Sequence, residues 1–188
     1  MSHSFYELLQ ANPIIAAVRS EEEIYNVLDS PSKIVFILKG NINTLNQHVG
    51  LLKNKNKIVL LHFDLLLGLS KDFHGLEFIS KNIKIDGVIT TRPNIIEAAK
   101  SMDLYAVQRV FLLDTMSLES GIESINKYKA DAVEVIPGLM PNVIQFFSEN
   151  TQTPIITGGL IKTKDDIINA LGSGATAISS SEKTVWYL

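Results

Sequence analysis

Short apolar runs alternate along the chain with stretches in which apolar residues recur at helical spacing. Runs rich in isoleucine and valine predict eight strands, at Pro13–Val18, Lys33–Leu38, Lys57–His62, Asp86–Thr90, Leu104–Val110, Asp131–Ile136, Thr153–Thr157 and Ala175–Ile178. Near-continuous apolar strands between amphipathic helices indicate a parallel sheet that is buried on both faces. Eight repeats favour a closed barrel over an open flavodoxin-like sheet, which needs about five strands.

Helix start signals lie between the predicted strands. Ser20, Ser117 and Thr163 precede helical stretches as N-caps, and Pro93 and Pro141 stand at first turns, where a missing N–H costs nothing. The sequence therefore predicts an α/β fold, a compact TIM-type (β/α)₈ barrel formed by residues 1–188 as a single domain. Because such barrels usually have about 250 residues, we expect minimal loops and one helix that is shortened or missing.

Composition narrows the class of protein. A hydrophobic content of 46% supports one core, while a net charge of −3 gives no general attraction to nucleic acid or membranes and leaves a local basic patch open. The absence of cysteine excludes disulfides and thiolate chemistry and suits a reducing compartment. No apolar stretch reaches the roughly 18 residues of a membrane span. We expect a cytoplasmic protein with no membrane contact.

Polar residues follow the predicted strands at the end of a barrel where function resides. Arginine and lysine outnumber carboxylates there, which suits an anion that also carries neutral polar groups. Gly158-Gly159 and Ser179-Ser180-Ser181 follow the last two strands, where barrels commonly bind phosphate through backbone N–H groups, hydroxyls and the start of a following helix. We predict a site for a small phosphate ester at Arg19, Asp64, Arg92, Arg109, Glu134, Gly158, Gly159, Ser179 and Ser180.

Several of these residues have a plainer interpretation. The glycines also suit a turn and the serines a helix cap, and Arg92 also suits a solvent-facing position. Arg109 interrupts an apolar run and needs an acceptor, so an ion pair with Glu134 is as well supported as ligand contact. His62 and Asp64 are two residues apart, which predicts one shared face of a strand, where His62 is either a satisfied core residue or a ligand contact.

The groups needed for catalysis are sparse. No predicted strand interior holds the lysine of a Schiff-base aldolase, and Asp64, Glu134 and His62 are too few for hydrolysis by a hard metal. We therefore expect a binding protein without metal or cofactor. Two alternatives stay open. One is a small barrel enzyme for a phosphorylated three-carbon or sugar substrate, with Asp64 or Glu134 as general acid or base, and the other is a protein-interaction scaffold.

Ordered motifs carry a family resemblance over almost the whole chain. The chain resembles the glycerol-uptake operon antiterminator regulatory family at Ala16–Arg19, His62–Leu65, Asp86–Arg92, Gln108–Asp114, Glu134–Gly138, Gly158–Ile161 and Ser179–Ser181. The resemblance implies a TIM-type barrel that senses glycerol 3-phosphate and acts on the leader mRNA of glycerol-utilisation genes.

The resemblance also implies roles for individual residues. The phosphate would be held by Gly158, Gly159, Ser179 and Ser180, and the glycerol part would face Arg19, Asp64, Arg109 and Glu134. The chain departs from the family pattern at Leu67, where relatives often have histidine, and at Glu182, where an asparagine is expected.

Lysines gather in the predicted helix-to-strand loops, on the barrel face opposite the ligand. They suggest an RNA-binding surface through Lys53, Lys55 and Lys57, against the plainer interpretation of ordinary solvated loops. Formation of a homo-oligomer is one way to join two such surfaces.

Overall fold

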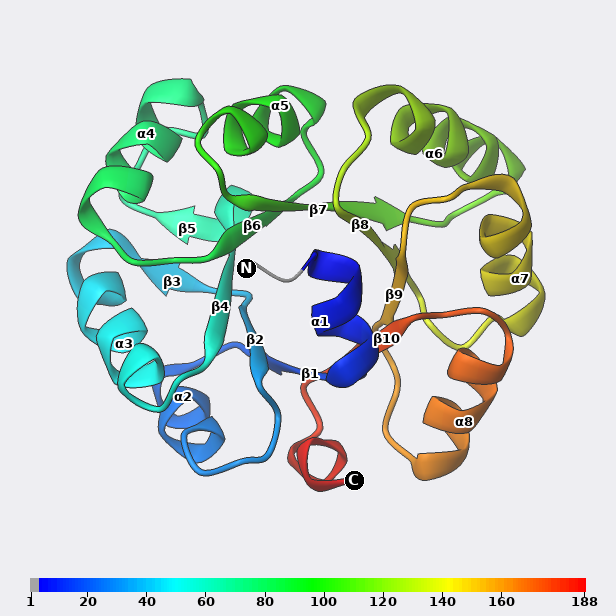
Figure 1. Ribbon diagram of the computed structural model, residues 1–188, viewed down its shortest axis with the longest axis horizontal. Helices are drawn as coiled ribbons and strands as arrows, with labels where there is room; N and C mark the ends of the chain where they lie inside the picture. Colours follow the sequence, from blue (N-terminus) through cyan, green and yellow to red (C-terminus); the bar gives the residue numbers. More distant parts are fainter. Residues whose placement is uncertain (1–3) are drawn as a thin grey trace.

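A computed structural model describes residues 4–188, and its parallel strands close into a barrel (Figure 1). The strand order around the barrel is β1-β10-β9-β8-β7-β6-β4-β2. These strands are β1 (Ile14–Val18), β2 (Ile34–Ile37), β4 (Ile58–His62), β6 (Gly87–Thr90), β7 (Tyr105–Phe111), β8 (Ala132–Ile136), β9 (Ile155–Gly158) and β10 (Ala177–Ser180). The predicted TIM-type barrel is confirmed, and each strand lies within two residues of its predicted bounds.

Helices surround the barrel and connect successive strands (Figure 1). They are α2 (Glu21–Val27), α3 (Ile42–Asn54), α4 (Phe73–Asn82), α5 (Pro93–Ser101), α6 (Thr115–Tyr128), α7 (Pro141–Asn150) and α8 (Lys164–Gly172). After β10 the chain forms only η2, a 3₁₀ segment at Lys183–Tyr187. The expectation of one shortened helix is met at this last position. No helix among residues 4–188 is long and apolar enough to cross a membrane.

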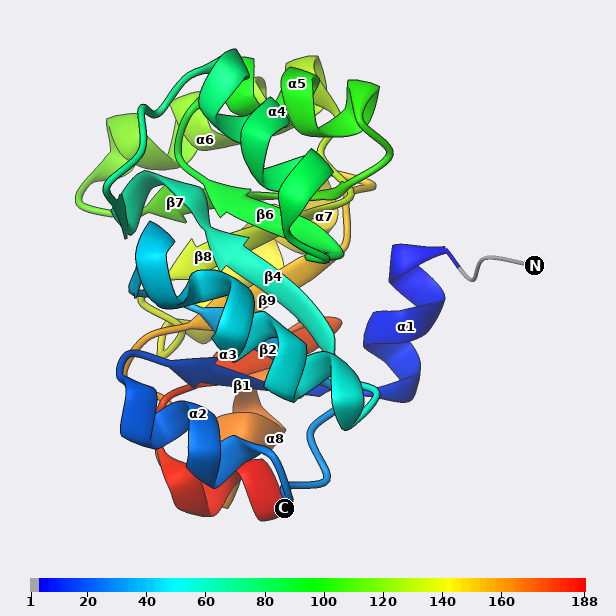
Figure 2. The same cartoon turned by 90° about the vertical axis from the view of Figure 1, so that its left-hand side faces the viewer.

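A further helix that the sequence did not predict, α1 (Phe5–Ala11), lies across the N-terminal end of the barrel (Figures 1 and 2). Its capping box joins Ser4 and Glu7, each side chain accepting a hydrogen bond from the other residue's backbone N–H. Phe5 and Leu9 are buried against the residues that fill the barrel. The helix α1 therefore covers the N-terminal end of the barrel interior (Figure 2).

Alternation along each strand decides which side chains point into the barrel. Apolar residues fill its lower part, among them Leu60 on β4, Val107 on β7, Ala132 on β8 and Ala177 on β10. Two residues further along these strands the same inward face carries His62, Arg109, Glu134 and Ser179. The packed apolar floor thus places a polar group of side chains at the C-terminal end.

A small second sheet lies beside the barrel next to α3. It pairs β3 (Gly40–Asn41) with β5 (Leu66–Leu67), and the 3₁₀ segment η1 (Phe63–Leu65) precedes β5. Asp64 lies in η1 and not on a strand, so the prediction that His62 and Asp64 share a strand face is wrong. The chain turns immediately after His62, so the alternation of side chains between the two faces of the strand ends there.

Candidate ligand-binding site

A cavity of about 430 Å³ opens at the C-terminal ends of the strands. It lies between the ends of β1, β7 and β8 and the loops that follow β9 and β10. Most of the predicted site lines it: Arg19, Arg109, Glu134, Gly159, Ser179 and Ser180. The structure therefore brings together residues that are spread over more than 160 positions of sequence.

A hydrogen-bonded group forms the floor of this cavity. The Arg109 guanidinium donates from Nε to Glu134 Oε2 at 2.7 Å, and its Nη2 lies 2.7 Å from the same oxygen. Ser179 Oγ donates to the other carboxylate oxygen, Glu134 Oε1, at 2.6 Å. Glu134 is 1% exposed and Arg109 7%. The expected ion pair is present, and because Arg109 also lines the cavity, Glu134 holds a guanidinium at the site.

His62 lies beside this group at the end of β4. The side chain is buried, and burial together with the nearby Arg109 charge lowers the pKa of its imidazole to about 4. Its Nδ1 has no hydrogen-bond partner among the described residues. The imidazole is therefore neutral at physiological pH and retains an unused polar atom, so it is not the satisfied core histidine that the sequence allowed.

Acidification should destabilise the protein through His62. Its folded pKa lies below the unfolded value of about 6.5, so the unfolded state binds more protons between the two values and stability is lost as pH falls through that window. Between pH 7.5 and pH 5 we expect His62→Leu to lose about 2 kcal/mol less unfolding free energy than wild type. Urea denaturation at both pH values measures the difference, and equal pH dependence in the two proteins would contradict the prediction.

The backbone at the end of β9 approaches the buried group closely because β9 ends in Gly158 and the following loop begins with Gly159. A Cβ at Gly158 would lie 2.4 Å from Ser179 Oγ and 2.8 Å from Glu134 Oε1. Gly159 has a φ of +75°, a conformation that favours glycine, and Leu160 follows with a φ of 65°. Gly159 and Leu160 line the cavity, whereas Gly158, which was predicted to hold the phosphate, does not.

The loop after β10 is held by its own hydrogen bonds. Ser180 Oγ donates to the Ile161 carbonyl at 2.7 Å and accepts from the Glu182 N–H at 3.0 Å, so this hydroxyl joins the two loops. The segment η2 that follows has five residues. The expectation that a helix start would add a dipole here is wrong, because one 3₁₀ segment of this length carries little aligned dipole.

Arg19 reaches the rim from the end of β1. Its backbone N–H donates to Glu23 Oε2 at 2.6 Å, and its Nη2 donates to Glu23 Oε1 at 2.9 Å. The side chain is half exposed, so the rim of the cavity carries a guanidinium that is anchored to α2.

Asp64 and Arg92 do not line the cavity. Asp64 accepts hydrogen bonds from the Thr90 hydroxyl at 2.7 Å and from the Thr91 N–H at 2.8 Å. Burial raises the pKa of the Asp64 carboxyl, but the hydrogen bonds from Thr91 and Thr90 outweigh it, and the net pKa is lowered. Arg92 Nε lies 3.8 Å from Asp64 Oδ1, and its Nη1 donates to the Lys71 carbonyl. Both side chains thus hold neighbouring loops, which their sequence positions did not show.

One charged residue of the cavity, Lys162, was missed, and another, Glu182, was named only as a departure from the family pattern. Lys162 lines the cavity, and its side-chain ammonium makes no hydrogen bond or ion pair within residues 4–188, while its backbone N–H donates to Asp166 Oδ2 at 2.9 Å. Its place three residues after Gly159 was the available signal. Glu182 also lines the cavity and accepts from the Thr184 hydroxyl at 3.3 Å. Three cations and two carboxylates therefore surround the space. Leu67, the other departure from the family pattern, lies outside it.

The lysines proposed for RNA contact are engaged elsewhere. Lys57 is 4% exposed and donates to the carbonyls of Ser30 and Ser32 at 2.6 and 2.8 Å. Lys53 lies 2.7 Å from Asp86 Oδ2, and Lys55 lies 2.7 Å from Asp29 Oδ1. The prediction is corrected for Lys57, which is too buried to reach an RNA phosphate, while carboxylates offset the other two charges.

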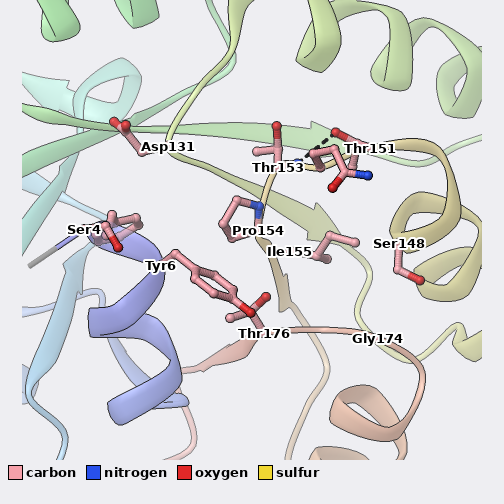
Figure 3. A pocket seen from close by; sticks show the side chains of 12 residues that line it. Ser4, Tyr6, Asp131, Ser148, Thr151, Thr153, Pro154, Ile155, Gly174 and Thr176 are labelled. Carbon is pink, nitrogen blue, oxygen red and sulfur yellow. Dashed lines mark hydrogen bonds between the residues drawn. The ribbon is translucent and has the colours of Figure 1, made fainter.

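A second hollow of about 580 Å³ lies beside α1 at the opposite end of the barrel (Figure 3). Its lining is mostly hydroxyl and apolar side chains, such as Tyr6, Thr153 and Thr176, and its one charged lining residue among residues 4–188 is Asp131. Without a cation it offers an anion little. Residues 4–188 contain no group of three or more His, Asp or Glu side chains suited to hold a metal ion.

Comparison with known proteins identifies the family. The glycerol-3-phosphate responsive antiterminator family matches residues 14–186. This chain belongs to that family. A glycerol uptake operon antiterminator regulatory protein of Listeria monocytogenes is 32% identical, with a TM-score of 0.89 over 92% of this chain and 94% of that one.

Further relatives support the same assignment. An antiterminator-related protein of Thermotoga maritima is also 32% identical, with a TM-score of 0.82 over 93% of this chain and 98% of that one. The uncharacterized protein YgcP of Escherichia coli is 32% identical over 96% of this chain and 95% of its own length. An epimerase and an aldolase at 14% and 15% identity share the barrel fold alone. The family description and the regulatory protein of Listeria monocytogenes together give the antiterminator family a regulatory function.

Proposed function

We propose that the cavity at the C-terminal ends of the strands binds glycerol 3-phosphate, and that the bound effector controls action on the leader mRNA of glycerol-utilisation genes. The observation that carries this proposal is the joint placement around one cavity of Arg109, fixed by Glu134, and of Lys162, whose ammonium has no partner among the described residues. Two cations at a glycine-lined wall provide charge-assisted hydrogen bonds for a phosphate monoester.

The lining distinguishes the two ends of such a ligand. Lys162 and the backbone at Gly159 lie on the wall that would take the phosphate. The Ser179 hydroxyl donates its hydrogen bond to Glu134, so its oxygen remains available to accept one from a glycerol hydroxyl. His62 does not line the cavity, so its Nδ1 is not assigned to the ligand. The effector would thus lie with its phosphate outward and its hydroxyl groups inward.

We further propose binding without turnover. Glu134 is occupied through both oxygens by Arg109 and Ser179, which leaves it poorly suited as a general acid or base. No cofactor is needed for such a role. An RNA regulator of this kind would act in the cytoplasm, where the transcripts are made.

Lys162→Ala should weaken glycerol 3-phosphate binding by at least about tenfold, because a hydrogen bond to a charged group contributes about 1.5–3 kcal/mol. Isothermal titration calorimetry with sn-glycerol 3-phosphate measures the affinity. Lys164→Ala is the matched control, since Lys164 lies two residues away and does not line the cavity.

The same samples test binding against catalysis. After incubation the ligand should be recovered unchanged, as judged by phosphorus NMR. Conversion of glycerol 3-phosphate would support the enzyme alternative, and equal affinity of wild type and Lys162→Ala would remove the cavity from consideration as the phosphate site.

A further inference from the structure

A separate cavity of about 510 Å³ lies next to the proposed effector site, also towards the C-terminal ends of the strands. It lies between α2 and α3 and is bounded by the small β3–β5 sheet, which Figure 1 shows beside α3. Its volume is within the range of about 300–1,000 Å³ that small-ligand sites occupy. Apart from Arg19, the residues that line this cavity take no part in the proposed effector site.

A buried polar atom in its lining lacks a hydrogen bond among the described residues. His48, on α3, is 7% exposed, and its Nε2 makes no hydrogen bond within residues 4–188. Glu21 Oε1 lies 3.4 Å away, an ion-pair distance for a protonated imidazole, and both residues line the cavity. A buried nitrogen without a hydrogen bond costs stability, so a ligand that bonds to it would recover that cost.

Cations at the same cavity give it an anion-binding side. Lys39 lines it, is exposed, and makes no hydrogen bond or ion pair among the described residues. Arg19 lines both this cavity and the effector cavity. The two spaces therefore share one guanidinium, and each has an ammonium of its own, Lys39 here and Lys162 there.

The third part of the lining is apolar and uncovered. Leu65 is 46% exposed and Leu67 is 65% exposed, and both line the cavity together with the buried Ile24. Exposed leucines beside a polar pocket suit a ligand with an apolar face. The hydroxyl of Thr44 and the amide of Asn41 lie in the same lining, and Asn41 Oδ1 already accepts from the Asn43 N–H, which leaves its amide N–H groups as donors.

From these contacts we infer that the cavity between α2 and α3 binds one nucleotide unit, a phosphate joined to a planar base. The phosphate meets Lys39 and Arg19, the base covers Leu65 and Leu67, and its edge bonds to His48. Single-stranded RNA is recognised by stacking of its bases on flat side chains, hydrogen bonds to base edges and charge along its backbone. Here the exposed leucines supply an apolar contact for the base face in place of an aromatic ring. The inference deepens the proposed function, because it places contact with RNA beside the effector site, with Arg19 common to both.

The test uses the full chain with defined probes. Binding of the fluorescently labelled tetranucleotides rA₄ and rU₄ is followed by anisotropy, and binding of AMP and UMP by ligand-observed NMR. Lys39→Glu and His48→Gln should each weaken the bound probe at least tenfold. Lys84→Glu is the control, because Lys84 also lacks a hydrogen bond or ion pair within residues 4–188 but lies in a loop at the opposite end of the barrel.

The outcomes separate the two sources of a nucleotide. Tighter binding of a tetranucleotide than of the mononucleotides supports an RNA strand, and equal binding supports a free nucleotide at the same site. Absence of binding by all four probes, or binding that Lys39→Glu and His48→Gln leave unchanged, overturns the inference. Calorimetry with glycerol 3-phosphate runs in parallel, and wild type that binds nucleotide here but no glycerol 3-phosphate would sink the proposed function alone.

Discussion

Glu134→Ala is expected to lower the free energy of unfolding by about 3–5 kcal/mol, because the change leaves a buried guanidinium without its partner. Arg109 is 7% exposed, and Glu134 is its one ion-pair partner among the described residues. Ser179 Oγ would also lose its acceptor. Urea denaturation followed by far-UV circular dichroism at pH 7.5 gives the difference from wild type.

A double variant separates lost pairing from lost packing. Arg109→Met combined with Glu134→Leu removes both charges and keeps apolar volume, so it should recover most of the stability that Glu134→Ala loses. It should also bind no glycerol 3-phosphate, since no guanidinium then remains on the cavity floor. A Glu134→Ala protein that is destabilised by less than about 1 kcal/mol would mean that water or movement of Arg109 satisfies the charge.

The ion pair of Arg109 and Glu134 supports the proposal that the cavity binds a ligand without catalysing its conversion. Glu134 accepts hydrogen bonds through both carboxylate oxygens, one from Arg109 and one from Ser179. Gly158 has no side chain, which leaves room for the Glu134 and Ser179 side chains. The result is a fixed cation above an apolar floor, which favours recognition of an anion over proton transfer to it.

The barrel could be predicted from the sequence because its signal is repeated and local. Each strand is a short apolar run, and each helix carries its own start signal, so the whole pattern tolerates errors of two residues at any boundary. Arg109 and Glu134 were paired correctly for a related reason. Adjacent strands of a parallel barrel put inward residues of matching register side by side, and the register pairs these two directly.

Asp64 could not be placed by the same rule. The 3₁₀ segment that begins at Phe63 ends the alternation, and the partners of the carboxylate, Thr90 and Thr91, come from another strand end. The prediction that Lys57 contacts RNA was wrong for a different reason. Its run of alternating lysines and asparagines looks solvated, yet two carbonyls from the α2–β2 loop, Ser30 and Ser32, accept from its buried ammonium. Contacts of this kind depend on tertiary structure and leave no periodic trace.

Gly158→Ala is expected to weaken glycerol 3-phosphate binding by about 100-fold, equivalent to about 2.7 kcal/mol. The added methyl group would lie 2.4 Å from Ser179 Oγ and 2.8 Å from Glu134 Oε1, so the hydrogen bond between them must move. Displacement of Glu134 carries Arg109 with it, since both guanidinium contacts go to one carboxylate oxygen. Calorimetry with glycerol 3-phosphate measures the loss, and overpacking should also cost about 1–3 kcal/mol of unfolding free energy.

Gly50→Ala is the matched control, because nothing lies within 4 Å of a Cβ at this position in α3. It should bind normally and gain about 0.5–1 kcal/mol of stability, as alanine does over glycine inside a helix. Ser179→Ala added to Gly158→Ala removes the closer of the two contacts and should restore part of the stability. Wild-type affinity in Gly158→Ala would show that effector binding does not depend on the Glu134–Ser179 contact. It would contradict a binding site above Arg109, Glu134 and Ser179.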